Sequence, residues 1–268
     1  MNFQVLKTLF FNTFQKELRS KALLFFFFLS LTTILGVNAV FSLISSFTDQ
    51  IPTFVGEYKL SALYYIVSIW GGILGIILGV GCIKSDMNFG VAQQIIAFPV
   101  RPFMYMLVRI LGTWVMVNAY YLLTLITALI IFTVTDGKFI IGLNIFYSFC
   151  IFSIVILISI TLAAFFSMHF TKITSFITTI MFYFIIQGCN SLFITTPTYQ
   201  NMEIASSIGL AFHLIFPRIG VINSISNSLF MGRGIQLDLL PQIIHFFVSY
   251  GLLLFVLFIS FKKRDYES

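Results

Sequence analysis

LSALYYIVSIWGGILGIILGVGCI, residues 60–83, is an apolar stretch without a single charged side chain. A helix needs about 20 mostly apolar residues to cross the hydrocarbon core of a bilayer. This stretch is long enough, and it predicts a transmembrane helix. Gly71, Gly75 and Gly79 recur at every fourth residue within it. Small residues at this spacing allow two helices to approach closely, either within one chain or between two copies.

Similar apolar runs lie on both sides of this stretch. The whole chain has 268 residues, of which 59% are hydrophobic and only 9% are charged, whereas a soluble domain has about 25% charged residues. We therefore predict an all-α integral membrane protein in which residues 1–268 form a single transmembrane domain. Its predicted spans are residues 22–45, 60–83, 107–134, 141–166, 172–194 and 239–261.

Lysine and arginine gather on one side of these spans. Because such residues favour cytoplasmic loops, we predict that both termini and the 84–106 loop are cytoplasmic in a multi-pass protein of the cell (inner) membrane. The basic residues lie beside apolar spans, which does not favour binding to nucleic acid. Those on the predicted cytoplasmic side are Lys7, Lys16, Arg19, Lys21, Lys84, Arg101, Arg109, Lys172, Lys262, Lys263 and Arg264.

Ionisable residues are sparse within the spans. No Asp or Glu lies in the middle of any predicted span, although ion-coupled carriers usually need such groups at bilayer depth. An intramembrane lipid-modifying enzyme would need a nucleophile, an acid–base pair or a metal cluster, but His169, His213 and His245 are scattered. Both classes remain alternatives. The cysteines, expected to be buried free thiols without metal-ligand spacing, are Cys82, Cys150 and Cys189.

The first 21 residues predict an amphipathic helix. Its apolar residues recur at steps of three and four, which places them on one helical face. Such a helix is expected to lie in the cytoplasmic interface, with its apolar face in the acyl boundary. It either anchors the first span or also braces a cytoplasmic partner. The apolar residues of this face are Phe3, Leu6, Phe10, Phe14 and Leu18.

A short polar stretch, SDMNFGVAQQIIAFPVRP at 85–102, separates the second and third spans. Met87, Val91, Ile95 and Phe98 fall on one helical face, and Pro99 and Pro102 are expected to stop the helix. The pattern predicts a short cytoplasmic helix held between two spans. Amphipathicity alone is compatible with a position on lipid or against another protein.

The same stretch resembles the type-2 permeases of ATP-binding-cassette (ABC) exporters. These permeases have an acidic cluster after the second span, then glycine, a short helix and proline; Asp86, Gly90, VAQQIIAF and Pro99 are similar here. The basic segment KELRSK, 16–21, resembles the segment before the first span of the family. Val91 replaces the usual threonine, and Arg101 comes one position earlier than in the family pattern.

The resemblance implies a membrane-spanning permease subunit that forms the substrate path of an exporter. Residues 85–102 would be its coupling helix, on which two separate cytoplasmic ABC ATPase subunits dock. A second copy or a related permease would complete the path within membrane lipid. The implied ATPase contacts are Asp86, Phe89, Gly90, Gln93, Gln94, Pro99 and Arg101.

The chain is expected to be a non-catalytic subunit with no cofactor of its own. A phosphate-binding loop needs G-x-x-x-x-G-K-[ST] after a strand. GVGCIKS, 79–85, has Ile83 where the second glycine is required, and it ends an apolar span. ATP and Mg²⁺ are therefore expected in the partner ATPase.

Residues 195–238 predict two amphipathic helices separated by Pro217. The resemblance implies an outer-face re-entrant or interfacial segment that forms a gate, and a simple interfacial cap is the alternative. Polar side chains within spans usually face other helices, so they line the substrate path or a dimer seam, or they serve helix packing. The polar residues considered for these roles are Asn38, Asn118, Tyr121, Gln187 and Asn190.

Overall fold

The computed structural model describes residues 3–19, 21–47, 52–85, 102–136, 142–195, 204–233 and 239–267. These residues form helices and short turns, and no strand occurs among them. The helices are α1 (Phe3–Arg19), α2 (Lys21–Phe47), α3 (Pro52–Cys82), α6 (Pro102–Asp136), α7 (Leu143–His169), α8 (Lys172–Thr195), α9 (Ile204–Ile215), α10 (Ile219–Phe230) and α11 (Leu239–Glu267).

Six of these helices are long and apolar enough to cross a membrane, which confirms the prediction of an all-α protein with six such helices. The third begins at Pro102 rather than at the predicted residue 107. Proline is well tolerated in the first turn of a helix, where its missing N–H has no partner to lose. The apolar segments are Lys21–Ile44, Tyr58–Cys82, Pro102–Thr135, Leu143–His169, Lys172–Cys189 and Leu240–Lys263.

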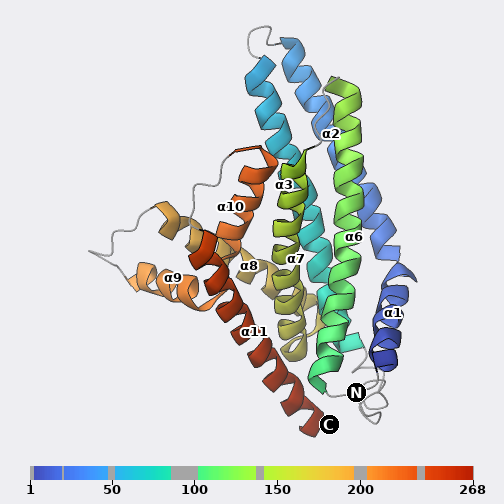
Figure 1. Cartoon of the computed structure of the whole chain (residues 1–268), viewed down its shortest axis with the longest axis vertical. Coiled ribbons are helices and arrows are strands. Elements are labelled where there is room, and N and C mark those ends of the chain that lie inside the picture. The colour runs from blue at the N-terminus through green and yellow to red at the C-terminus, as the bar shows by residue number, and fades with distance from the viewer. Residues whose placement is uncertain are drawn as a thin grey trace.

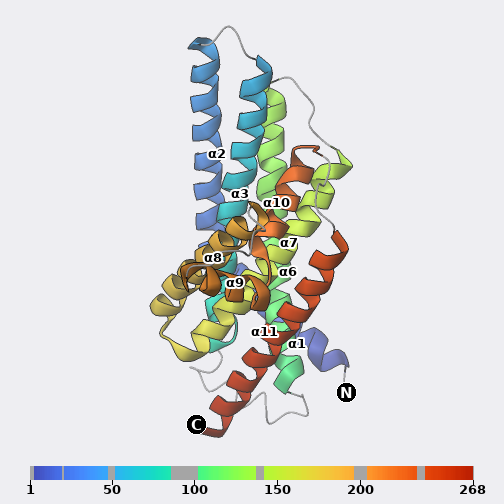
Figure 2. The ribbon, with the colours of Figure 1, turned by 90° about the vertical axis from the view of Figure 1, so that its left-hand side faces the viewer.

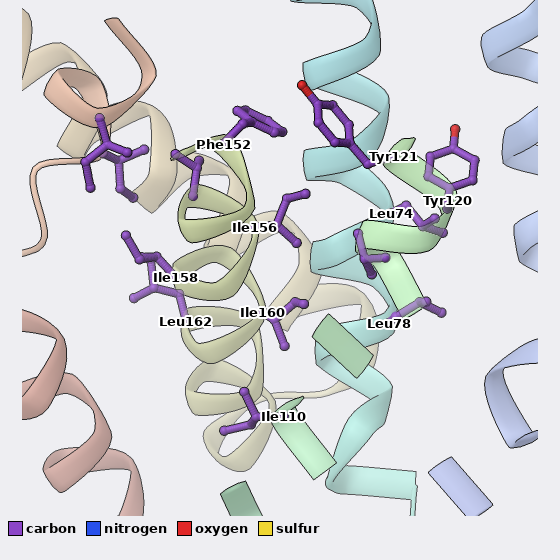
Figure 3. Close-up of a cluster of buried hydrophobic side chains, with 14 of the residues drawn as sticks. Leu74, Leu78, Ile110, Tyr120, Tyr121, Phe152, Ile156, Ile158, Ile160 and Leu162 are labelled. Carbon is purple, nitrogen blue, oxygen red and sulfur yellow. The ribbon is translucent and has the colours of Figure 1, made fainter. Parts of the chain in front are cut away.

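The helix α7 lies at the centre of the bundle. It packs against α3, α6, α8, α10 and α11, and its middle residues are buried on every side. In Figure 3, Ile156 and Ile160 of α7 point toward α3 and α6, whereas Ile158 and Leu162 point the other way. A helix surrounded in this way needs an apolar surface all round, which the sequence of α7 provides.

Glycines set the distance between α3 and α7. A Cβ atom on Gly79 would lie 2.9 Å from the backbone Cα and O of Ile160, and one on Gly75 would lie 3.6 Å from Ile156 Cγ2. A Cβ on Gly71 would meet the ring of Tyr121 in α6 at 2.9 Å. The spacing of the glycines was compatible with packing within one chain or between two copies. In the structure these glycines allow close packing within one chain.

The helices α9 and α10 form a bent pair between α8 and α11. Their axes differ in direction by 71° across the break at Phe216–Arg218. α9 packs on α8, whereas α10 packs on α7, α8 and α3. One side of α10, which includes Ile219, Ile222 and Ile225, is buried in the bundle. Both helices predicted for this region are present, and protein covers the inner side of α10.

Both ends of the chain lie at the same end of the bundle (Figure 1). The end of α3 and the start of α6, which flank residues 86–101, also lie there. The view at right angles shows the same arrangement, with α2, α3 and α6 extending past α7 and α10 at the opposite end (Figure 2). We call the end that holds both termini the base of the bundle.

The three cysteines differ in their surroundings. None of the three forms a disulfide, and Cys82 is buried in the core as predicted. Cys150 is exposed on α7 and Cys189 is only half-buried. The prediction of a buried thiol is therefore wrong for Cys150, because an apolar helix in a membrane bundle has residues on its outer surface as well as in its core.

Candidate functional site

The helix α1 packs along the lower part of α6 at the base of the bundle (Figure 1). Thr13 and Glu17, one turn apart, are buried at 1% and 6% exposure. Leu18, which belongs to the predicted apolar face, is left 55% exposed. Phe10 and Phe14 of the same face are half-buried. The buried surface of α1 therefore includes polar side chains as well as part of the apolar face.

Arg109 of α6 is a buried polar residue that contacts α1. Its side chain is only 3% exposed, and its Nη1 donates a hydrogen bond of 2.7 Å to Thr13 Oγ1. The guanidinium lies over the ring of Tyr105, with Cζ 5.6 Å from the ring centroid. A hydrogen bond from a charged donor contributes about 1.5–3 kcal/mol. Arg109 therefore fastens α1 to the first turns of α6.

The end of α3 also contacts α1. Lys16 of α1 donates a hydrogen bond through Nζ to Ser85 Oγ. The Ser85 hydroxyl in turn donates to the carbonyl of Gly81 at 2.6 Å. The neighbouring Lys84 donates to the carbonyl of Phe170, in the turn between α7 and α8. The last residues of α3 are thus joined both to α1 and to the α7–α8 turn.

Aromatic rings hold the start of α6 against the end of α11. The rings of Phe103 and Phe258 meet edge to face at 5.4 Å between centroids. Those of Tyr105 and Phe261 lie 6.1 Å apart. Such pairs contribute about 0.5–1.5 kcal/mol beyond the area that they bury. The first turn of α6 is therefore packed on α11, and the following turns, which include Arg109 and Gly112, are packed on α1.

These contacts define a base cluster, which consists of Thr13, Lys16, Glu17, Ser85 and Arg109. It joins α1 to the two helix ends from which residues 86–101 depart. A force applied to the 86–101 segment would therefore reach α3, α6 and α1 together. The sequence showed the basic segment 16–21, but nothing in the sequence indicated that Thr13 and Arg109 meet.

A disulfide between α1 and α6 tests this packing. A Cβ atom on Gly112 would lie 3.1 Å from Thr13 Cβ. In a cysteine-free background, Thr13→Cys with Gly112→Cys is expected to cross-link readily on mild oxidation, because disulfide-bonded cysteines have Cβ atoms about 4 Å apart. The control pair is Phe11→Cys with Gly112→Cys, since Phe11 is exposed. Equal cross-linking of both pairs, measured by gel mobility after proteolysis between the helices, would contradict the packing.

The predicted ATPase contacts lie outside the described residues. Asp86, Phe89, Gly90, Gln93, Gln94, Pro99 and Arg101 all belong to the 86–101 segment. The structure describes the two residues that precede this segment, Lys84 and Ser85, and Pro102, which follows it.

Among those whose side chains the structure describes, the polar residues considered for a path or seam have separate partners. Asn38 of α2 accepts a long contact of 3.4 Å from Thr135 of α6. Asn118 donates to the carbonyl of Trp114 in its own helix at 2.8 Å. Tyr121 is buried, and its ring lies 4.8 Å from that of Phe152. Gln187 is half-buried on α8, and the side chain of Asn190 lies outside the described residues.

A second polar group, missed from the sequence, lies at the bend between α9 and α10. Arg218 Nη1 donates to Gln242 Oε1 of α11 at 3.0 Å, and His245 Nε2 lies 2.9 Å from the carbonyl of Leu214. These contacts satisfy the end of α9 and tie it to α11. They account for Arg218 and His245 as structural residues, and His213 lies half-buried nearby on α9.

Within the described ranges, no group of three or more His, Cys, Asp or Glu side chains is arranged to hold a metal ion. Comparison with models of known protein families and with curated proteins found no match. The class of protein is therefore defined by the fold alone. The chain is an all-α, multi-pass membrane protein with six helices apolar enough to span, and its best-defined polar site is the base cluster.

Proposed function

We propose that the chain is the permease subunit of an ABC exporter. Separate cytoplasmic ATPase subunits dock on the 86–101 segment and drive the helices that form the substrate path. The chain itself hydrolyses no ATP. A second permease, identical or related, completes the path.

The observation that carries this proposal is the anchoring of both ends of the 86–101 segment. Ser85 at its start contacts Lys16 of α1, and Arg109, two turns after its end, contacts Thr13 of the same helix. A loop that only lies on lipid would not need contacts that hold the neighbouring helix ends to α1. A docking element that transmits force needs stiff connections to the spans, and the base cluster provides them.

The proposed cycle follows from these connections. ATP binding brings the two ATPase subunits together, and the 86–101 segment moves with the subunit on which it is docked. The movement passes through α3 and α6 to α7, which both helices contact. ATP shifts the permease between conformations only to the extent that the docked ATPases prefer one of them.

Cross-linking at residue 93 tests the docking. In a cysteine-free background, Gln93→Cys is expected to cross-link to an ATPase subunit in native membranes treated with a short bifunctional reagent. Asn144→Cys is the matched control, because Asn144 is exposed in the first turn of α7. The helix α7 starts at the end away from the base (Figure 1). The docking would be contradicted if a bulky aqueous reagent labels the cysteine at residue 93 without hindrance and if this cysteine cross-links no more than the one at residue 144.

A further inference from the structure

Three buried hydroxyl groups lie close together at the contact between α3 and α6. Tyr64 and Ser68 are one turn apart on the same face of α3, and Tyr121 belongs to α6. Tyr64 is 0% exposed, Tyr121 is 1% exposed and Ser68 is 6% exposed. The core around them is largely apolar. We call these three residues the hydroxyl site.

A glycine of α3 brings Tyr121 to this place. Gly71 lies one turn after Ser68, and a Cβ atom on Gly71 would lie 2.9 Å from Cδ2 of the Tyr121 ring. The ring therefore lies directly against the backbone of α3 (Figure 3). On α7, it packs against Phe149 and Phe152, at 5.7 and 4.8 Å between ring centroids. These contacts hold the Tyr121 hydroxyl beside Ser68.

The Ser68 hydroxyl is the group that points to a ligand. Ser68 lies close enough to the hydroxyls of Tyr64 and Tyr121 to interact with them. Among the described residues, however, its Oγ has no hydrogen-bond partner. Ser159, in contrast, donates to a carbonyl of its own helix at 2.9 Å. Buried polar groups are nearly always hydrogen-bonded to protein or to ordered water, so the Ser68 hydroxyl needs a partner that is not a protein atom.

The donors and acceptors of the hydroxyl site match one water molecule. The Tyr64 hydroxyl donates its only proton to Asn223 Oδ1 of α10 at 2.8 Å, so its oxygen can only accept a further bond. Ser68 and Tyr121 each carry one proton to donate. A water molecule would accept from Ser68 and Tyr121 and donate to Tyr64 Oη. Three such bonds are the usual number for a buried water.

We propose that the hydroxyl site binds one water molecule, which is held by hydrogen bonds to Tyr64, Ser68 and Tyr121. This water joins Tyr121 of α6 to Tyr64 of α3, and Tyr64 is in turn bonded to Asn223 of α10. A polar connection thus runs through three helices in a largely apolar core. The site does not suit an ion, because its uncharged hydroxyls provide no countercharge and burying an unpaired charge is costly.

Thermal unfolding of the full chain in mild detergent tests the site without nucleotide or any partner. Ser68→Ala is expected to lower the unfolding temperature by about 2–4 °C, the shift that corresponds to one lost hydrogen bond in a chain of this size. Tyr121→Phe is expected to cause a similar fall. Because both residues bind the same water, the double variant should unfold close to the temperature of either single variant.

Ser159→Ala is the matched control, because Ser159 is 0% exposed and its hydroxyl is bonded within α7. Its effect is expected to add to that of Tyr121→Phe. The proposal is overturned if Ser68→Ala leaves the unfolding temperature unchanged or raises it, since removing a hydroxyl that has no partner relieves a cost. Additive effects of Ser68→Ala and Tyr121→Phe would overturn it as well.

A high-resolution structure of the full chain in lipid nanodiscs gives the direct readout, whether or not the variants fold. We expect density for one water molecule within hydrogen-bonding distance of Ser68 Oγ and of both tyrosine oxygens. A Ser68 hydroxyl that donates to a carbonyl of α3, with no density between it and the two tyrosines, would overturn the proposal. Failure to find an ATPase partner would leave this result intact.

Discussion

Replacing Gly79 by alanine is expected to destabilise the folded bundle by about 1–3 kcal/mol, the usual cost of overpacking. The added Cβ would lie 2.9 Å from the backbone of Ile160. Because the obstacle is backbone rather than a flexible side chain, α3 and α7 have to move apart along their length. The thermal unfolding temperature in mild detergent is the measurement, and Gly79→Leu is expected to prevent folding altogether.

Gly72→Ala is the matched control for this experiment. Gly72 lies on the same helix, but a Cβ atom placed there has nothing within 4 Å. Since alanine is about 1 kcal/mol more favourable than glycine inside a helix, Gly72→Ala is expected to be neutral or slightly stabilising. Equal stability of the two variants would show that α3 and α7 do not pack closely at Gly79.

The second large effect is expected from Arg109→Ala. The change removes the hydrogen bond to Thr13 and the contact with the Tyr105 ring. A loss of about 2 kcal/mol is expected from the hydrogen bond of a charged donor. Because α1 depends on this contact, limited proteolysis should cut α1 at least several times faster in the variant.

Arg19→Ala provides the comparison, because Arg19 also carries a positive charge on α1 but is exposed. Its removal changes the charge near the membrane by the same amount without disturbing the base cluster. If both variants show the same rate of proteolysis and the same unfolding temperature, Arg109 acts only through its charge. The base cluster would then not hold α1 against α6.

The sequence was sufficient to predict the six apolar helices. Each apolar run is at least as long as a helix that crosses a bilayer, and an apolar run of this length predicts a transmembrane helix. The helices on either side of Pro217 were also predictable, because a periodic apolar pattern on each side of a proline indicates two short helices. In both cases local sequence determines the result.

The packing of α1 could not be predicted in the same way. An apolar stripe is compatible with lipid or protein, and the buried positions include Thr13 and Glu17 rather than the stripe alone. What decides the orientation is Arg109, which lies 96 residues away from Thr13 in the sequence. The spacing of the glycines in α3 likewise predicted close helix packing. It could not predict that α7 is the helix packed against them, because that contact joins residues far apart in the sequence.

The polar contacts between α7 and α10 show a further limit of sequence reasoning. Serine, asparagine and tyrosine within an apolar run often bond to their own helix, and Thr124 does so. Ser148 and Ser226 bond to each other across 78 positions. Only the arrangement of α10 against α7 separates these two cases.

The proposed function is tested most directly by purifying the chain from its native membranes in a mild detergent and assaying the product for ATPase activity. We predict that a P-loop ATPase co-purifies in stoichiometric amount and hydrolyses ATP. We also predict that a variant with Gly90 and Gln93 replaced by bulky acidic residues loses this partner while retaining its own unfolding temperature. A homogeneous chain that carries no ATPase, purified under conditions that preserve other membrane complexes, would contradict the permease function.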